Sequence, residues 1–154
     1  MKTKFLPLIS SVLLLGAFAS SAQAQQPSAQ KVLFERLGGL KGITVVVDDF
    51  IDRLVANEIL NKNPAIDAGR KSSPAPYLKF HVSMLVCEVT GGPCKYTGRS
   101  MKESHAHLNI TENEWSVMAA DFKKSLDKFK VPAPEQAELF AIVGTTKGDI
   151  VVKK

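Results

Sequence analysis

Residues 43–55 read ITVVVDDFIDRLV, and the spacing of the apolar side chains in this stretch decides the fold class. These side chains recur at i, i+3, i+4, i+7 and i+11, which places them on one face of an α-helix. They are Ile43, Val46, Val47, Phe50 and Leu54, with Asp48, Asp49, Asp52 and Arg53 elsewhere on the circumference. The stretch therefore predicts an amphipathic helix, despite its β-branched residues.

The next 35 or so residues predict a loop and then a second helix. Residues 61–76 contain three prolines, a glycine and two serines, which favour a loop. Residues 77–90 are apolar over most of the helical circumference and predict a helix enclosed by the protein, ended by Gly91-Gly92-Pro93. One edge of this helix carries Lys79, Ser83 and Thr90, and the other side carries Leu78, His81 and Leu85.

The C-terminal part begins with two capping boxes, each of which predicts a helix start: Ser100 with Glu103, and Thr111 with Glu114. After the first box, Met101, His105 and Leu108 share one face, and His107 points roughly opposite. The second box opens a helix with the apolar stripe Trp115, Met118, Phe122, Leu126 and Phe129. A last helix follows Pro132 and Pro134, with Leu139, Ile142 and Val143 facing the core. Only the apolar end 150–152 resembles a strand, so residues 32–154 predict one all-α domain.

The size and charge of the chain narrow the classes of function. A chain of 154 residues suits one globular domain. Of the formal net charge of +5, two units come from Lys2 and Lys4. The remaining charges of both signs are interspersed, without a basic block, so nucleic-acid binding is not expected.

Residues 1–24 predict a secretory signal peptide. The two N-terminal lysines precede an apolar run over residues 5–18, and Ala22-Gln23-Ala24 forms a small-x-small cleavage site. The apolar run is short for a membrane anchor, and no other segment predicts a membrane span. We therefore expect an exported protein, in a bacterial periplasm, with residues 25–31 as a disordered lead-in.

Export bears on the redox state of the two cysteines, Cys87 and Cys94, which are separated by EVTGGP. In an oxidising compartment a disulfide between them would close a short loop and add about 2 kcal/mol of stability. Two unpaired, partly buried thiols are the alternative. No Cys-x-x-Cys-His motif occurs, so the sequence does not predict covalent attachment of a c-type haem.

Two histidines on apolar helix faces point to a cofactor. Each of His81 and His105, taken alone, fits a core histidine that bonds to the backbone. Together they would present imidazoles from two helices to one apolar space, which is what an iron porphyrin requires. The chain has no nucleophile turn, His-Glu-x-x-His motif or glycine-rich phosphate loop that would favour another chemistry.

Three segments resemble a group I truncated haemoglobin in their order and spacing, over about residues 32–147. They are LFERLGG at 33–39, VVVDDF at 45–50, and Gly91-Gly92 followed by KYTGRSMKESH at 95–105. The resemblance implies a two-over-two helical sandwich around haem b (iron protoporphyrin IX). It also implies that His105 is the proximal iron ligand, and that His81 lies where some cyanobacterial members place a distal iron ligand.

The same resemblance implies further haem contacts. Met101 matches a haem-contacting residue, and Leu108 shares its face. Tyr96 matches the tyrosine near a haem propionate, and Arg99 is a suitable cation for the same group. The distal side would be formed by Phe50, Leu78, Val82 and Val86. His107 competes with His105 as the ligand, but we expect it at the surface.

The sequence departs from the family at two places. Ile51 stands where the family usually has a tyrosine that donates a hydrogen bond to bound oxygen, and this loss would weaken oxygen retention by about ten- to a hundredfold. His81 could replace the donor, with Tyr77 a weaker candidate, or could itself ligate the iron. Asn61-Lys-Asn-Pro64 replaces a phenylalanine pair, in a connection longer than the family's.

The first functional hypothesis is a haem protein that binds oxygen, nitric oxide or carbon monoxide. A bis-histidine electron-transfer or redox protein, which would need a redox partner, is the alternative, as is a nitric oxide dioxygenase. A helical adaptor without a cofactor is the remaining reading. We expect a monomer or weak oligomer.

Overall fold

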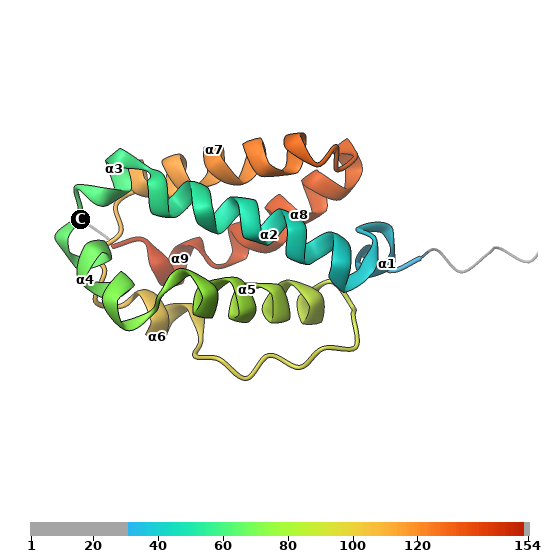
Figure 1. Ribbon diagram of the computed structural model, residues 1–154, viewed down its shortest axis with the longest axis horizontal. Helices are drawn as coiled ribbons and strands as arrows, with labels where there is room; N and C mark the ends of the chain where they lie inside the picture. Colours follow the sequence, from blue (N-terminus) through green and yellow to red (C-terminus); the bar gives the residue numbers. More distant parts are fainter. Residues whose placement is uncertain (1–30, 153–154) are drawn as a thin grey trace, which may run out of the picture.

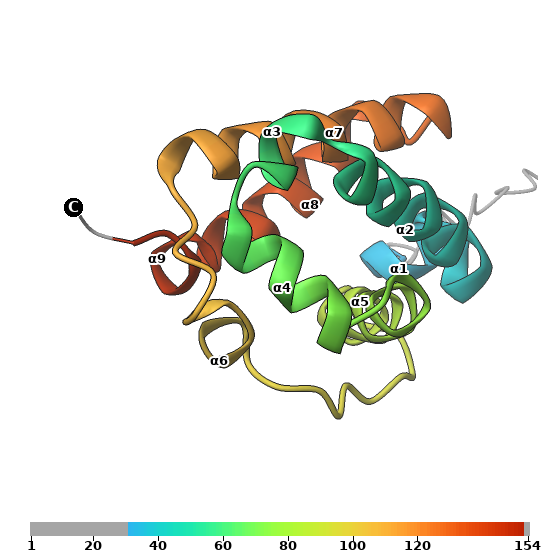
Figure 2. The same ribbon diagram turned by 60° about the vertical axis from the view of Figure 1, so that its left-hand side comes forward.

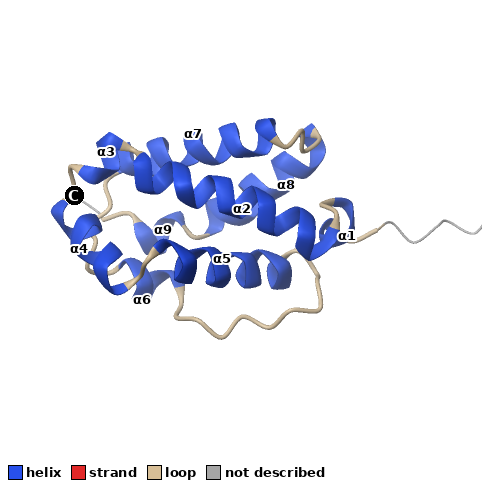
Figure 3. Cartoon of the chain, in the orientation of Figure 1, coloured by secondary structure: helices blue, strands red, loops and turns tan. Residues whose placement is uncertain are grey.

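The computed structural model describes residues 31–152, and its regular elements there are helices (Figures 1 and 3). The predicted signal peptide and almost all of the predicted lead-in lie outside these residues. The helices are α1 (Leu33–Arg36), α2 (Gly39–Ala56), α3 (Glu58–Asn61), α4 (Pro64–Ser72), α5 (Ala75–Val89), α6 (Met101–His105), α7 (Glu112–Lys128), α8 (Ala133–Thr145) and α9 (Lys147–Ile150). Among the helices described, none is both long and apolar enough to cross a membrane.

Helix α2 is the centre of the fold, because it packs against α5 on one side and α7 on the other (Figure 1). The predicted helix over residues 43–55 is confirmed and begins earlier, at Gly39. Toward α5, α2 buries Ile43, Val47 and Ile51 in a cluster with Cys87. Toward α7, the ring of Phe50 lies 5.1 Å from that of Phe122, centroid to centroid. Ile51 was absent from the predicted apolar stripe, yet it is buried, because α2 has two packed faces rather than one.

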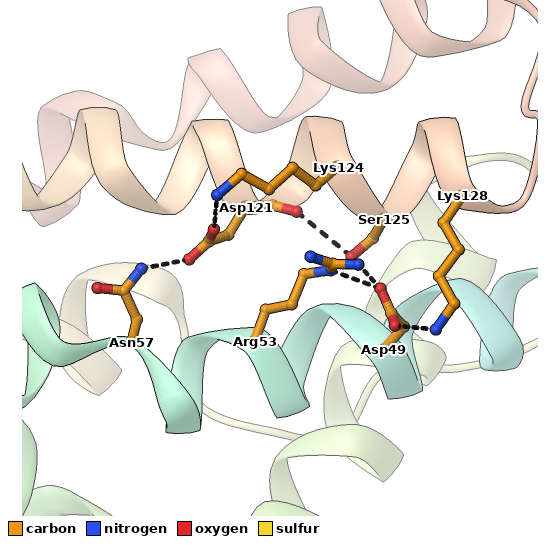
Figure 4. A network of polar contacts seen from close by, with 7 residues as sticks. All are labelled: Asp49, Arg53, Asn57, Asp121, Lys124, Ser125 and Lys128. Atoms are coloured by element: carbon orange, nitrogen blue, oxygen red, sulfur yellow. Dashed lines mark hydrogen bonds and ion pairs between the residues drawn. The ribbon is translucent and has the colours of Figure 1, made fainter.

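A polar strip also joins α2 to α7 (Figure 4). Asp49 of α2 accepts hydrogen bonds from Arg53 (2.6 Å), from Ser125 of α7 (2.8 Å), and from Lys128. Farther along, Asp121 of α7 accepts from Asn57 and Lys124. We call these seven residues the α2–α7 polar strip. Asp49, which the sequence placed off the apolar face of α2, therefore lies between α2 and α7.

The predicted loop over residues 61–76 is wrong, because α4 occupies most of it (Figure 2). Asn63 caps this helix with its side-chain oxygen, and Pro64 stands in the first turn, where a helix needs no backbone N–H. Arg70 and Lys71 lie in the last turn, next to the negative end of the helix dipole. At the start of α5, Pro74 is the N-cap residue and Pro76 stands in the first turn. The three prolines of residues 61–76 therefore lie at the starts of helices rather than in a loop.

The predicted helix over residues 77–90 is confirmed as α5, but it is not enclosed, since Phe80 is 59% exposed. Its polar edge is also covered: Ser83 and Thr90 are buried, and Lys79 forms ion pairs of 2.7 and 2.8 Å with two aspartates of α2, Asp48 and Asp52. The helix ends as expected, with Gly91 in the left-handed conformation at φ 87°. Just beyond, Cys94 is joined to Cys87 by a disulfide, with Cα atoms 5.7 Å apart.

Both predicted capping boxes are present, at the starts of α6 and α7. Of the predicted α7 stripe, Trp115, Phe122 and Leu126 are buried, but Phe129 is 38% exposed. Placing Phe129 in the core was wrong because it follows the last residue of α7, where the helical periodicity ends. Leu139 of α8 is buried with Ile142 and Val143 packed around it, as predicted. The apolar C-terminal end forms only an isolated parallel bridge between Ile110 and Val151.

Candidate functional site

His105 ends the five-residue helix α6, and one nitrogen of its ring has a fixed partner. Nδ1 lies 2.8 Å from the carbonyl oxygen of Met101, one turn earlier. Since a carbonyl only accepts, Nδ1 carries the proton, and Nε2 is left with a lone pair. Burial lowers the pKa of this imidazole and outweighs the opposing effect of the Met101 hydrogen bond. The ring is therefore neutral, with Nε2 free to donate electrons to a metal.

Hydrogen bonds tie down the turn after His105. The backbone N–H of Leu108 donates to the carbonyl of His105 at 2.9 Å. Asn109 follows in the left-handed conformation, at φ 51°. The capping box of Thr111 and Glu114 then starts α7. His107 is exposed in this turn, as the sequence predicted.

His81 lies on α5 among aromatic rings. Its ring centroid is 4.2 Å from that of Tyr77, 5.2 Å from that of Phe80 and 6.1 Å from that of Tyr96. Nδ1 is buried and has no hydrogen-bond partner among the described residues. A buried polar atom without a partner costs about 1–3 kcal/mol. Such an atom fits a site that a ligand completes.

The loop between α5 and α6 places Tyr96 against α5. The hydroxyl of Tyr96 donates to the backbone carbonyl of Arg99 at 2.7 Å, so this side chain holds the loop in shape. Burial raises the pKa of Tyr96, which therefore stays protonated near neutral pH. Arg99 is exposed. The two predicted propionate neighbours thus lie in one loop, with the tyrosine beside His81.

The predicted distal residues meet where α2 packs on α5. Leu78, Val82 and Val86 of α5 all pack against the cluster that contains Ile51, and Phe50 borders the same cluster. Met101 and Leu108 lie apart from these, with His105, in and just after α6. Within residues 31–152, no hydrogen bond or ring contact joins His105 to His81. The site residues therefore form two groups, one on α2 and α5 and one around α6.

Sequence reasoning missed Asn63, whose side chain reaches the backbone of Leu108 at 3.0 Å. The available signal was the pair Asn63-Pro64, which is typical of a helix start. No local pattern could show the contact with Leu108, because 45 positions separate the two residues.

The donor set fits a haem better than a metal held by protein alone. In the described part of the chain, no group of three or more His, Cys, Asp or Glu residues could hold a metal ion. A haem needs only an axial donor from the protein, because the porphyrin supplies the equatorial ligands. The free Nε2 of His105 and the unpartnered Nδ1 of His81 are two imidazole nitrogens of the kind that binds haem iron.

Comparisons with known proteins identify the family. The family model described as bacterial-like globin matches residues 32–152. A group 1 truncated hemoglobin of Synechocystis sp. is 26% identical over 117 residues, which cover 73% of this chain and 89% of the relative. One of Mycolicibacterium paratuberculosis is 25% identical over 118 residues, which cover 77% of this chain and 82% of the relative.

Solved structures show the same fold. The truncated hemoglobin of Tetrahymena pyriformis, in its Fe(III) form, superposes with a TM-score of 0.69 at 20% identity, over 80% of this chain and all of that one (100%). The 2/2 hemoglobin of Synechococcus sp. PCC 7002, in the cyanomet state with covalently attached heme, gives 0.68 at 22% identity, over 79% of this chain and 98% of that one. The all-α, two-over-two arrangement predicted from the sequence is confirmed.

Proposed function

This chain belongs to the bacterial-like globin family, and from this we propose that it binds haem b and, at the haem, a diatomic gas such as oxygen, nitric oxide or carbon monoxide. The observation that carries the proposal is the hydrogen bond from Nδ1 of His105 to Met101, which leaves Nε2 as a lone-pair donor on a neutral ring. We assign His105 as the proximal ligand. The haem supplies the iron at which the gas binds.

The other residues of the site have supporting parts in this proposal. Met101 orients the imidazole through its carbonyl, and Met101 and Leu108 would contact a haem bound beside His105. The α2–α5 interface supplies the apolar distal wall, formed by Phe50, Ile51, Leu78, Val82 and Val86. Ile51 offers no hydrogen-bond donor to a gas. Arg99 would supply the cation for a haem propionate, and Tyr96 sets the shape of the loop that carries this arginine.

His81 supports a second candidate function, that of a bis-histidine electron-transfer or redox protein. The supporting observation is the buried Nδ1, which has no hydrogen-bond partner in the part of the chain that the structure describes, on a ring that lies against Tyr77 and Tyr96. An imidazole in this state gains by binding a metal or by donating a hydrogen bond to a ligand. With His81 as a sixth ligand, a gas would have to displace it, which lowers the apparent affinity.

We also propose that the protein is exported, through a signal peptide over residues 1–24, to a periplasm. The disulfide between Cys87 and Cys94 supports this, because disulfides persist in oxidising compartments. Mass spectrometry of the protein secreted by a bacterial host would test it. A mature N-terminus at Gln25 is expected, and a full-length chain retained in the cytosol would contradict the proposal.

Absorption spectra of haem-reconstituted protein test the proximal assignment, with His107→Ala as the matched control. We expect the wild type and His107→Ala to show an intense Soret band, since His107 is exposed. His105→Ala removes the axial ligand itself, so haem affinity should fall by more than the roughly 10- to 100-fold that second-sphere substitutions cost. Unchanged haem affinity in His105→Ala would refute the assignment.

The two candidate functions are separated by ferrous spectra of the wild type and His81→Ala. A bis-histidine protein gives the six-coordinate spectrum in the wild type and the five-coordinate spectrum in the variant. Identical five-coordinate spectra would exclude His81 as an iron ligand and leave the gas-binding protein with an open sixth position.

A further inference from the structure

Every polar atom of the Asn63 side chain is engaged, and the contacts join three elements. Its Oδ1 accepts from the backbone N–H groups of Ala65 (2.9 Å) and Ile66 (3.4 Å), which caps α4. Its Nδ2 donates to the carbonyl oxygen of Leu108 at 3.0 Å and to Oε1 of Glu114 at 2.8 Å. One amide therefore ties the start of α4 to the turn after α6 and to the first turn of α7.

The contact with Leu108 acts on the segment that presents His105. Leu108 donates its own N–H to the carbonyl of His105 at 2.9 Å, so both the N–H and the carbonyl of this residue are hydrogen-bonded. The side chain of Leu108 lies against α4 as well, because a Cβ added at Gly69 would stand 3.2 Å from its Cδ2. Both the backbone and the side chain of Leu108 are thus held by α4.

Helix α6 depends on such outside contacts, because five residues are too few to form a stable helix alone. At its start, the hydroxyl of Ser100 and the carboxylate of Glu103 satisfy each other's backbone N–H groups. Past its end, the hydrogen bond from Asn63 to Leu108 is the side-chain contact on the turn. The backbone that carries His105 is therefore held on both sides, and the hydrogen bond between its Nδ1 and the carbonyl of Met101 sets the ring on that backbone.

The acceptor on α7 strengthens the anchor. Glu114 is buried, and its Oε2 accepts from both the N–H and the hydroxyl of Thr111 at 2.7 Å. Burial raises the pKa of Glu114, but the hydrogen bonds from Thr111 and Asn63 outweigh that effect and lower it. The carboxylate is ionised, and a hydrogen bond to a charged acceptor is stronger than one to a neutral acceptor.

We propose that Asn63 is a positioning residue of the proximal site: it fixes the turn after His105 and so couples the placement of α4 to the orientation of that imidazole. The proposal rests on the assignment of His105 as the haem ligand. Helix α4 precedes α6 in sequence by one helix and a loop, and through Asn63 its placement would influence how His105 is presented to the haem.

The chain contains a matched control in Asn57. Its Oδ1 caps α3 through Ile59 (3.0 Å) and Leu60 (3.3 Å), and its Nδ2 donates to the buried carboxylate of Asp121 on α7. Asn57 thus makes the same cap and the same kind of carboxylate contact as Asn63, without any contact with Leu108. Replacement of either residue by serine keeps a good capping side chain and removes the Nδ2 donor.

The first measurement needs no haem. Hydrogen exchange at the Leu108 amide is compared among wild type, Asn63→Ser and Asn57→Ser apoproteins, each shown to be folded by circular dichroism. Loss of one hydrogen bond of ordinary net strength should speed exchange about tenfold in Asn63→Ser and leave it unchanged in Asn57→Ser. Asn63→Ala is a second variant for the same comparison. Equal exchange in the two serine variants would overturn the proposal.

The second measurement is the iron–histidine stretching band in the resonance Raman spectrum of the ferrous haem complex. We expect it to shift or broaden in Asn63→Ser and to stay unchanged in Asn57→Ser, because a merely destabilised protein keeps its axial bond. Faster exchange at Leu108 with an unchanged band would overturn the positioning role. Absence of haem from the wild type would refute the proposed function instead, and the exchange measurement would still report on the anchor.

Discussion

The two histidines of the site are held in opposite ways. His105 stands in a network of hydrogen bonds: its own nitrogen bonds to Met101, and capping boxes flank its turn on both sides. His81 has aromatic neighbours and a buried nitrogen without a partner, on a helix that a disulfide links to the following loop. The α6 side is thus ordered by polar contacts, and the α5 side by packing and one covalent bond. The first arrangement suits a permanent ligand, and the second suits a group that changes partners.

The largest effect is expected from removal of the disulfide that links α5 to the following loop. Removal of the disulfide in Cys87→Ala/Cys94→Ala should lower the free energy of unfolding by about 2–3 kcal/mol, because the unfolded chain regains the entropy of a closed loop. Denaturant unfolding with and without a reductant measures this. Hydrogen exchange should quicken in residues 91–100 and stay unchanged in the turn after His105.

The double variant itself is the control for the reductant, which should have no effect on it. An equal rise in exchange on the α5 side and on the α6 side would contradict the comparison, since it would show that the disulfide orders the whole domain rather than the region beside His81.

The second prediction concerns the α2–α7 polar strip (Figure 4). This strip connects the two sides, because α2 packs against α5, which carries His81, and α7 follows the turn after His105. Burial raises the pKa of Asp49, but its hydrogen bonds from Lys128, Arg53 and Ser125 outweigh this and lower the pKa from 3.8 to about 2. A group with a lowered folded pKa stabilises the protein above its unfolded pKa. That stability, about 2 kcal/mol, should be lost as the pH falls from about 4 to 2.

The measurement is the free energy of unfolding between pH 5 and pH 2 for the wild type, Asp49→Asn and Asp48→Asn. Asp49→Asn should lack most of this acid-induced loss. Asp48 is the control because it is exposed and pairs with α5 rather than with α7. The same steep acid-induced loss in Asp49→Asn would show that other carboxylates account for it.

Much of the fold could be predicted from the sequence, because its signals are local. The apolar period of α2 and the two capping boxes each depend on residues a few positions apart, and each was confirmed. Helix α4 was missed because a proline ends a helix in one context and starts it in another, and the distinction depends on the capping role of Asn63. The polar edge of α5 could not be placed either, since the partners of Lys79 lie on α2.

In the candidate site, too, local features could be predicted from the sequence and long-range contacts could not. The two histidines could be selected as candidates because each lies on an apolar helical face, which is a local pattern. Their hydrogen-bonding states were not predictable, because the sequence does not show that Met101 engages one ring or that the other ring has no partner. The anchor from Asn63 to Leu108 spans 45 positions and exists only once α4 and α6 are packed together.

The smallest expected effect is an increase in the free energy of unfolding, and it tests whether Nδ1 of His81 lacks a hydrogen-bond partner. In the apoprotein, His81→Leu replaces a buried polar atom that lacks a partner with an apolar side chain, so the free energy of unfolding should rise by about 1 kcal/mol. His107→Leu is the control, since His107 is exposed and its replacement should change stability by less than about 0.5 kcal/mol. With haem bound, the wild type should be more stable than His81→Leu, because His81 then gains a partner that leucine cannot replace. A loss of stability in apo His81→Leu would mean that the nitrogen is satisfied in solution, and that the two histidines are held more alike than their contacts indicate.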